Sequence, residues 1–260
     1  DLDRMSEAEA AVPRAKAAVE RLGGATVAAQ MLHDALGTVD DETGRYADAV
    51  KEHEAAIALE KKALGPRHLR VARSLKRLGT ALRDDGELEA ALRAYGESLA
   101  IEEEVLGPTH PDVASTVQAS GVTLSRLGRY AEARAAYERA LAIRERILGE
   151  DHPLVGETLA SLVVAMRWSG AAAEALPLAE RAERIEEASF GAENEKTAGA
   201  INNVGYVEEA LARLAEARDA YERSLRIREK LFGRGSRIAK GGSTVNGAIG
   251  LVSTELGGGI

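Results

Sequence analysis

Apolar residues recur along this chain three or four positions apart, in segments that short polar turns separate. The clearest stretch lies between Gly107 and Leu148, where VASTVQASGVTLS is followed by the turn RLGRY and then by AEARAAYERALAIRERIL. This spacing keeps the apolar side chains of each segment on one face. The pattern therefore predicts two amphipathic helices joined by a short turn, that is, a helical hairpin.

The hairpin pattern repeats with a period of 42 residues. A glycine that follows a bulky apolar residue opens each copy, and these glycines are Gly23, Gly65, Gly107, Gly149, Gly191 and Gly233. Periods of 20 to 50 residues are typical of solenoids, in which each unit buries its apolar face against its neighbours. We therefore expect an all-α chain of stacked antiparallel helix pairs.

These glycines divide the chain into five complete repeats with a partial repeat at each end. The complete repeats are 23–64, 65–106, 107–148, 149–190 and 191–232. Residues 1–22 are typical of the second helix of an incomplete preceding repeat, and residues 233–260 of a degenerate, glycine-rich terminal half-repeat. Because both ends fall inside a repeat, we expect the chain to be a piece of a longer protein.

Small residues and rings recur at fixed places inside each repeat. Counted from the opening glycine, a second glycine stands at position 14 in four repeats, an alanine at position 26 in all five, and a tyrosine at position 30 in three. The tyrosine lies one helical turn after the alanine, on the same face. We expect the small residues to bring the two helices close together and the rings to fill the seam between repeats.

This combination resembles the tetratricopeptide repeat pattern. The residues that carry it most clearly are Leu78, Gly79, Leu82, Ala91 and Tyr95. The usual unit of that family has 34 residues, and the extra residues at the end of the second helix, together with GPTHPDVA, resemble the longer repeats of kinesin light chains and their bacterial relatives. The resemblance implies a right-handed superhelical solenoid whose first helices line a concave groove, and it implies no particular partner.

The loop that opens each repeat has a structural interpretation. We expect Gly107 to adopt the left-handed conformation that ends a helix and Pro111 to occupy the first turn of the next one. His68, His110 and His152 recur with the same period, but equivalent positions on packed helices lie about 8 to 10 Å apart, too far to share a zinc ion with ligands at about 2 Å. We expect these histidines to cap helices or pack in loops, and we expect no metal site.

Composition and motifs exclude several classes of function. The formal net charge is −8, cysteine is absent and no run of 18 apolar residues occurs, which argues against a general nucleic-acid binder, thiolate chemistry and a membrane span. Catalytic and phosphate-binding motifs are missing, and the carboxylates occur in runs such as EEE that are typical of solvated helix faces. We expect a cytoplasmic, non-enzymatic protein without a cofactor, and heavy use of Ala, Arg and Gly indicates a bacterial source.

The family resemblance assigns positions 8, 11, 15, 18 and 19 of each repeat to the groove. These positions are basic in the middle of the array and acidic toward its ends. The candidate binding residues are Arg73, Lys76, Arg83, Gln118, Arg126, Arg167, Trp168, Asn202 and Tyr206. Cationic side chains suit carboxylates and Trp168 suits an anchoring contact, so we predict an extended acidic peptide as the partner. Ordinary surface charge is the alternative interpretation.

The repeat 149–190 departs most from the pattern. Ala179 stands where other repeats have the tyrosine, and Pro177 falls inside the second helix, where proline costs about 3 kcal/mol unless the helix bends. Tolerated drift is one interpretation of these changes, and a functional hinge is the other.

Three functions remain open. The first is a protein-interaction scaffold that binds a partner segment in its groove. The second is a regulatory or assembly region of a larger bacterial signalling protein, such as a serine/threonine kinase, because similar arrays resemble segments that follow kinase domains. The third is a self-associating structural module, which would make the protein a homo-oligomer.

Overall fold

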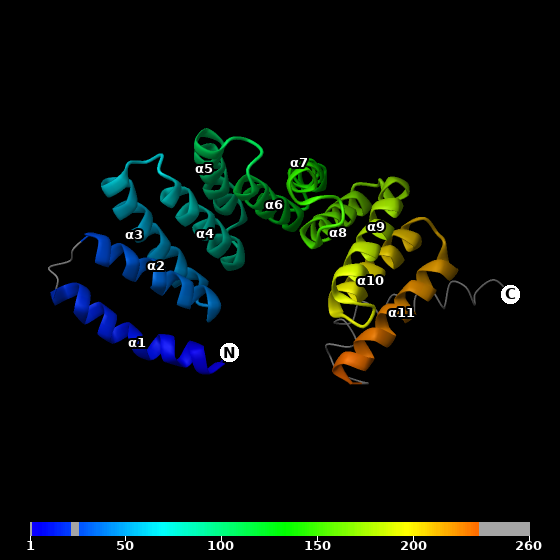
Figure 1. Cartoon of the computed structure of the whole chain (residues 1–260), viewed down its shortest axis with the longest axis horizontal. Coiled ribbons are helices and arrows are strands. Elements are labelled where there is room, and N and C mark those ends of the chain that lie inside the picture. Colours follow the sequence, from blue (N-terminus) through cyan, green and yellow to red (C-terminus); the bar gives the residue numbers. More distant parts are fainter. Residues whose placement is uncertain (1, 22–25, 234–260) are drawn as a thin grey trace. The chain divides into compact units, whose positions relative to one another are not determined.

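The computed structural model describes residues 2–21 and 26–233, which form eleven α-helices and no strand (Figure 1). The chain divides into two compact units, Asp1–Leu127 and Gly128–Ile260. The boundary lies in the turn within the repeat 107–148. The described part of the chain is therefore all-α, as the spacing of apolar residues predicts.

The first unit contains six helices that pack in order along the chain. They are α1 (Leu2–Arg21), α2 (Thr26–Glu42), α3 (Tyr46–Leu64), α4 (Leu69–Asp85), α5 (Leu88–Leu106) and α6 (Pro111–Arg126). The pair α2 and α3 packs on the pair α4 and α5 through the contact between α3 and α4, and α6 packs on α5 (Figure 1).

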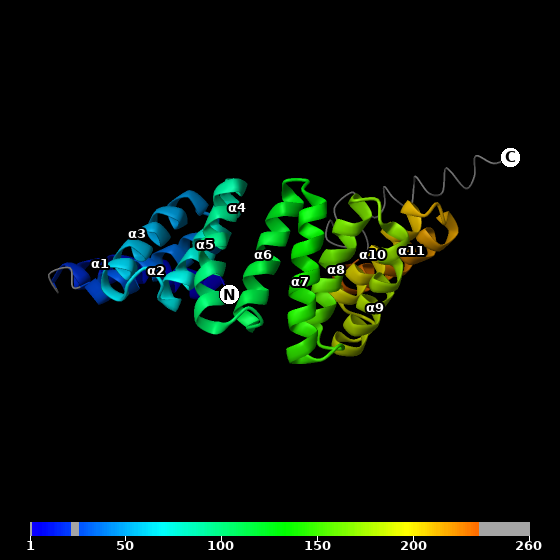
Figure 2. The same ribbon diagram turned by 90° about the horizontal axis from the view of Figure 1, so that it is seen from above.

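The second unit repeats this arrangement with five helices. They are α7 (Tyr130–Leu148), α8 (Pro153–Trp168), α9 (Ala172–Phe190), α10 (Glu195–Ala210) and α11 (Leu214–Phe232). Each helix packs on the next one (Figure 2). Helix α8 also contacts α10, so the first helices of these two neighbouring pairs lie side by side.

Helix boundaries keep the 42-residue period. The first helices α4, α6, α8 and α10 begin at residues 69, 111, 153 and 195, and the second helices α3, α5, α7, α9 and α11 begin at residues 46, 88, 130, 172 and 214. The helix expected within residues 1–22 is α1. Of the half-repeat expected at residues 233–260, all but Gly233 lies outside the described residues.

A ring packed on a glycine joins the two helices of a pair. A Cβ atom added to Gly79 would lie 2.7 Å from Tyr95 Cε1, and one added to Gly205 would lie 2.7 Å from Tyr221 Cδ1. Both rings are completely buried, and the Tyr95 hydroxyl lies 3.1 Å from Thr80 Oγ1. The rings that were expected to fill the seam between repeats thus lie directly against the glycine of their own pair.

Two repeats change the residues of this contact and keep its fit. In the repeat 23–64 the ring is that of His53, which lies 2.5 Å from the Cβ position of Gly37. In the repeat 149–190, Ala179 replaces the ring and Val163 replaces the glycine, and both side chains are buried. A smaller residue on one helix thus accompanies a larger one on the other, as close packing requires.

Helix α9 continues through Pro177, which is its sixth residue. Proline at this place removes the backbone hydrogen bond that residue 177 would donate to the Ala173 carbonyl, and its ring crowds that carbonyl. The interpretation of this repeat as a hinge stays a prediction.

The glycines that open the repeats from Gly65 onward do not adopt the left-handed helical conformation expected of Gly107. Gly107 ends α5 with φ 87° and ψ 156°, a combination that is essentially restricted to glycine. Pro108 favours such an extended ψ in the residue before it, yet Gly149 has nearly the same angles before Glu150. The conformation therefore belongs to the loop itself, which leads the chain away from one helix and into the next.

We expect the substitution Gly79→Ala to lower the free energy of unfolding by about 1 to 3 kcal/mol, because the added methyl group overlaps the Tyr95 ring. Gly96 in α5 of the same pair provides the matched control, since nothing lies within 4 Å of its Cβ position. Gly96→Ala should raise the free energy of unfolding by up to about 1 kcal/mol through helix propensity. Urea unfolding followed by circular dichroism measures both effects, and equal effects would contradict the ring-on-glycine contact.

A second prediction concerns the turn inside each pair. Gly44, Gly86, Gly128 and Gly170 have positive φ there, and Ala212 occupies the equivalent place with φ 57°. A left-handed conformation costs a residue with a Cβ about 1 to 2 kcal/mol. Glycine avoids this cost, but it also raises the conformational entropy of the unfolded chain, which offsets part of the gain. Ala212→Gly should therefore stabilise the protein by up to about 1 kcal/mol.

Thermal and urea unfolding check this expectation. Gly170→Ala is the reciprocal control and should destabilise the protein by a similar amount. An Ala212→Gly protein that is no more stable than the wild type would show that the turn relaxes without strain.

Candidate partner-binding site

The nine predicted binding residues all lie on first helices, five in the first unit and four in the second. We call the five the α4/α6 surface and the four the α8/α10 surface. The α4/α6 surface contains Arg73, Lys76, Arg83, Gln118 and Arg126, and the α8/α10 surface contains Arg167, Trp168, Asn202 and Tyr206.

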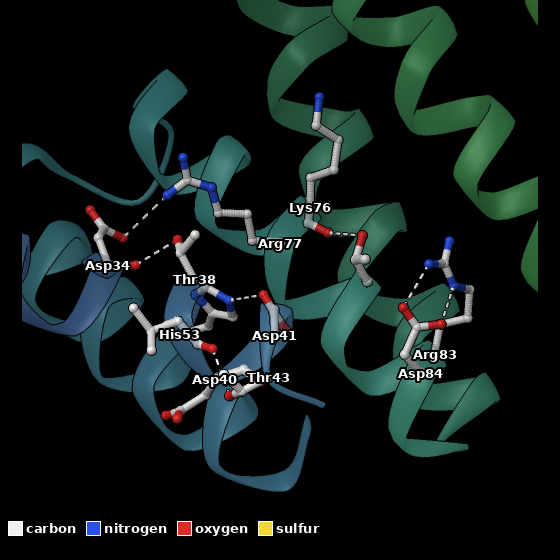
Figure 3. A network of polar contacts seen from close by, with 12 residues as sticks. Asp34, Thr38, Asp40, Asp41, Thr43, His53, Lys76, Arg77, Arg83 and Asp84 are labelled. Atoms are coloured by element: carbon white, nitrogen blue, oxygen red, sulfur yellow. Dashed lines mark hydrogen bonds and ion pairs between the residues drawn. The ribbon is translucent and has the colours of Figure 1, made fainter. Parts of the chain in front are cut away.

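Asp84 pairs with two of the predicted cations on the α4/α6 surface. Arg83 donates hydrogen bonds of 3.0 and 2.8 Å to the Asp84 carboxylate (Figure 3). Arg126 Nη1 lies 3.1 Å from Asp84 Oδ1 and donates to the Arg83 carbonyl at 3.0 Å. The hydrogen bonds from Arg83 hold the pKa of Asp84 below its usual value, so the carboxylate stays charged and links α4 to α6.

Lys76 faces a buried carboxylate. Its Nζ lies 3.8 Å from Glu102 Oε1, and Glu102 is only 1% exposed. Burial raises the pKa of the Glu102 carboxyl, and the Lys76 charge partly offsets that effect. Since Glu102 belongs to the EEE run, the expectation that such runs lie on solvated faces is wrong at this position.

The buried charge recurs with the period of the repeat, which is the signal that could have revealed it. Position 37 carries a buried ionisable side chain in four of the five repeats, Glu60, Glu102, Arg144 and Glu186, and the half-buried Arg228 in the fifth. Glu60 accepts a 2.6 Å hydrogen bond from Gln30 Nε2, and Arg144 donates to Thr158 Oγ1 at 2.5 Å. Burial raises the pKa of Glu186 and lowers that of Arg144.

Acidic and basic side chains face each other across the first helices of the first unit. Arg77 on α4 places a guanidinium nitrogen 3.8 Å from an oxygen of Asp34 on α2 (Figure 3). A guanidinium nitrogen of Arg70, also on α4, lies 3.8 Å from the other Asp34 oxygen. Arg73 is exposed and forms no hydrogen bond or ion pair with any residue that the structure describes. Most of the positive charge predicted in this part of the groove is therefore already paired.

The α8/α10 surface has a different arrangement, in which one cation lies between aromatic rings. The guanidinium carbon of Arg167 lies 4.8 Å from the centroid of the Trp168 ring and 4.9 Å from that of Tyr206, within the range of cation–π attraction. Tyr130 stacks on Trp168 with centroids 5.9 Å apart, and Tyr206 meets Tyr221 edge to face at 5.6 Å. These contacts form an aromatic ladder that holds Arg167 in place.

One end of the ladder makes a partly buried hydrogen bond, and one ring within the ladder is exposed. The Tyr221 hydroxyl donates to Glu209, and burial raises the pKa of Tyr221 so that it stays a neutral donor. Trp168 is 57% exposed. Arg167 has no carboxylate within ion-pair distance in residues 2–21 and 26–233, in contrast to Arg83 at the equivalent place in the repeat. The α8/α10 surface thus offers an unpaired cation beside an exposed indole.

Two predicted contacts are less accessible, and one contributor was missed. Gln118 and Asn202 are each only 7% exposed, so a partner backbone can reach little of either amide. Tyr130 was not predicted because it begins a second helix, α7, outside the positions that the family resemblance assigns to the groove. Its place next to Trp168 depends on packing between helices, which periodicity alone does not specify.

The three periodic histidines cap helices, as one of the sequence interpretations predicts. His68, His110 and His152 precede α4, α6 and α8, and each Nδ1 accepts a 3.1 Å hydrogen bond from the backbone N–H two residues later. Within the described ranges, no cluster of three or more His, Cys, Asp or Glu residues suits a metal ion. No helix in these ranges combines the length and apolarity needed to cross a bilayer.

Solved structures with a similar fold include several repeat proteins. BtubC (BKLC) from P. vanneervenii has a TM-score of 0.73 at 19% identity, covering 91% of this chain and 94% of that chain. A protein of Podosopora anserina described as a kinesin light chain with nearly identical TPR-like repeats has a TM-score of 0.68 at 22% identity, covering 78% and 95%. MamA has a TM-score of 0.56 at 16% identity, covering 80% and 96%. At these identities the likeness concerns the fold.

Sequence comparison identifies the family. Comparison with curated proteins gives no match. The family model described as "Tetratricopeptide repeat" matches four overlapping segments, residues 27–104, 77–145, 115–185 and 160–230. These segments include α3 to α10 and nearly all of α2 and α11. The chain therefore belongs to the tetratricopeptide repeat family.

Proposed function

We propose that this protein is a non-catalytic interaction scaffold that binds an acidic, extended segment of a partner protein on the α8/α10 surface. Tetratricopeptide repeat folds generally mediate protein–protein interaction. The observation that carries the proposal is the Arg167 guanidinium, which lies between the Trp168 and Tyr206 rings without a carboxylate partner among the described residues.

The chemistry of Arg167 suits a carboxylate ligand. A guanidinium within cation–π distance of two rings still has N–H groups, and these can donate to a carboxylate in a paired, planar arrangement. Because the two rings already restrict the side chain, little further entropy is lost when a ligand binds. Arg167 therefore supplies both charge and a fixed direction of approach.

The exposed indole supplies the apolar part of the contact. Trp and Arg are the residue types most enriched at the energetic centres of protein interfaces, and here Trp168 and Arg167 are adjacent. Val164, one turn earlier on α8, is also exposed. A peptide with an acidic residue next to an apolar one would match this order of side chains.

The α4/α6 surface plays a weaker part in this proposal. A ligand carboxylate would have to compete with Asp84 for Arg83 and Arg126, and with Glu102 for Lys76. Arg73 is exposed and can attract an acidic partner at long range. The other two functions left open, a region of a larger signalling protein and a self-associating module, stay predictions.

We expect Arg167→Glu to weaken the binding of acidic peptides at least tenfold. Loss of a hydrogen bond between charged groups costs about 1.5 to 3 kcal/mol, and each 1.4 kcal/mol is a factor of about ten in Kd. Fluorescence anisotropy with a panel of fluorescein-labelled acidic peptides measures the change. Arg184→Glu is the matched control, because Arg184 is exposed on the second helix α9 and the substitution alters the net charge equally.

Equal losses for Arg167→Glu and Arg184→Glu would reduce the effect to overall charge and contradict the proposed site. A panel in which no acidic peptide binds the wild-type chain would contradict the proposed ligand class.

A further inference from the structure

Three first helices are capped by histidine, which is an uncommon N-cap residue, and these histidines recur every 42 residues. Ser, Thr, Asp and Asn are the common N-cap residues, because each offers an oxygen that accepts from the first turn of the helix. In this protein α4, α6 and α8 are capped by imidazole nitrogen, and the corresponding helix α10 is capped by Asn194, whose Oδ1 accepts from Lys196 N–H at 2.9 Å. The same contact is thus made by a titratable group three times and by a non-titratable group once.

An imidazole can make this contact only while Nδ1 has a free lone pair. The neutral ring protonated on Nε2 meets this condition, whereas the protonated ring has N–H groups on both nitrogens. Its Nδ1–H would then point at a backbone N–H, and its positive charge would lie at the positive end of the helix dipole. Protonation therefore both removes the cap and adds repulsion.

The charged groups around the three rings are few, and most are paired with other residues. Asp112 Oδ2 lies 3.8 Å from His110 Nδ1, and within the described chain no other carboxylate lies within 4.0 Å of a nitrogen of these three rings. Beside His68, Arg67 pairs with Glu104 on α5, and Arg70 pairs with Asp34 on α2 and Glu60 on α3.

Beside His152, the neighbouring acids Glu150 and Asp151 belong to the same loop, and the Glu150 carbonyl accepts from Arg181 on α9. His68 and His152 depend mainly on their backbone contacts.

We propose that His68, His110 and His152 form a pH-sensitive set of helix caps, which hold the first turns of α4, α6 and α8 when neutral and release them when protonated. Histidine changes charge between about pH 5 and 8, so a modest acidification is the signal. Helix α10, with its asparagine cap, keeps its first turn at both ends of this range. The inference is independent of what binds to the α8/α10 surface.

Total stability is a poor test of this proposal, because buried carboxyls respond in the opposite direction. Burial raises the pKa of Glu102 and Glu186, so their contribution to stability is full below the ordinary carboxyl range and is lost as the pH rises through the raised values. The caps act the other way, since their contribution is present at high pH and lost as the pH falls. A local measurement on individual amides separates the two.

Amide hydrogen exchange of the 15N-labelled protein, followed by NMR at about pH 7.5 and about pH 5.5, provides that measurement. The reporting amides are those of Arg70, Asp112 and Leu154, which the histidines cap, with Lys196 as the internal control. After correction for intrinsic exchange, we expect the protection of the three histidine-capped amides to fall at least threefold relative to Lys196. An unchanged ratio between the three amides and Lys196 would overturn the proposal.

The triple substitution His68→Asn, His110→Asn and His152→Asn gives each helix the cap that α10 has naturally. In this variant the three amides should keep the same protection relative to Lys196 at both pH values. If the variant still loses protection at the lower pH, the release has another cause and the histidines are not the switch.

Discussion

The contact between a glycine on the first helix and a ring on the second is the constraint on which the rest of this structure depends. The absence of a Cβ on Gly79 and Gly205 lets the rings of Tyr95 and Tyr221 lie directly on the backbone of the facing helix. Where the ring is lost, at Ala179, a valine takes the place of the glycine. The helices that make these contacts begin every 42 residues along the chain.

The same period explains how residues at equivalent places acquire different roles. Arg83 and Arg167 stand at the same position of their repeats, but the residue that follows is Asp84 in one and Trp168 in the other. Beside Asp84 the guanidinium is held in an ion pair, and beside Trp168 it lies between rings and has no such partner in the described chain. One exchange of an acid for an aromatic residue thus turns a structural cation into one that is available to a ligand.

Periodicity predicted features that recur along the chain. The helix pairs could be inferred from the sequence for this reason, and capping was one of the two roles expected of the periodic histidines. The recurring rings were also visible, but they were expected in the seam between repeats, whereas Tyr95 and Tyr221 pack on the glycine of their own pair. The pairing of Arg126 with Asp84 could not be inferred, since it depends on side-chain conformations across two first helices. The burial of Glu102 was missed because a run of three glutamates suggests a solvated face, although its place in the repeat is a buried one. The backbone angles of Gly107 were not predicted either, because the usual rule for a glycine at a helix end gives the left-handed helical conformation.

Trp168 is the only tryptophan of the chain. Its fluorescence therefore tests whether an acidic segment binds on the α8/α10 surface, without any label on the protein. We expect titration with an acidic peptide to shift or quench the emission of Trp168 in a saturable manner. A neutral peptide of the same length, with Gln in place of Glu, should leave the emission unchanged. If calorimetry detects binding of the acidic peptide while the emission of Trp168 stays unchanged, the ligand binds elsewhere. That result would contradict the proposed site on the α8/α10 surface.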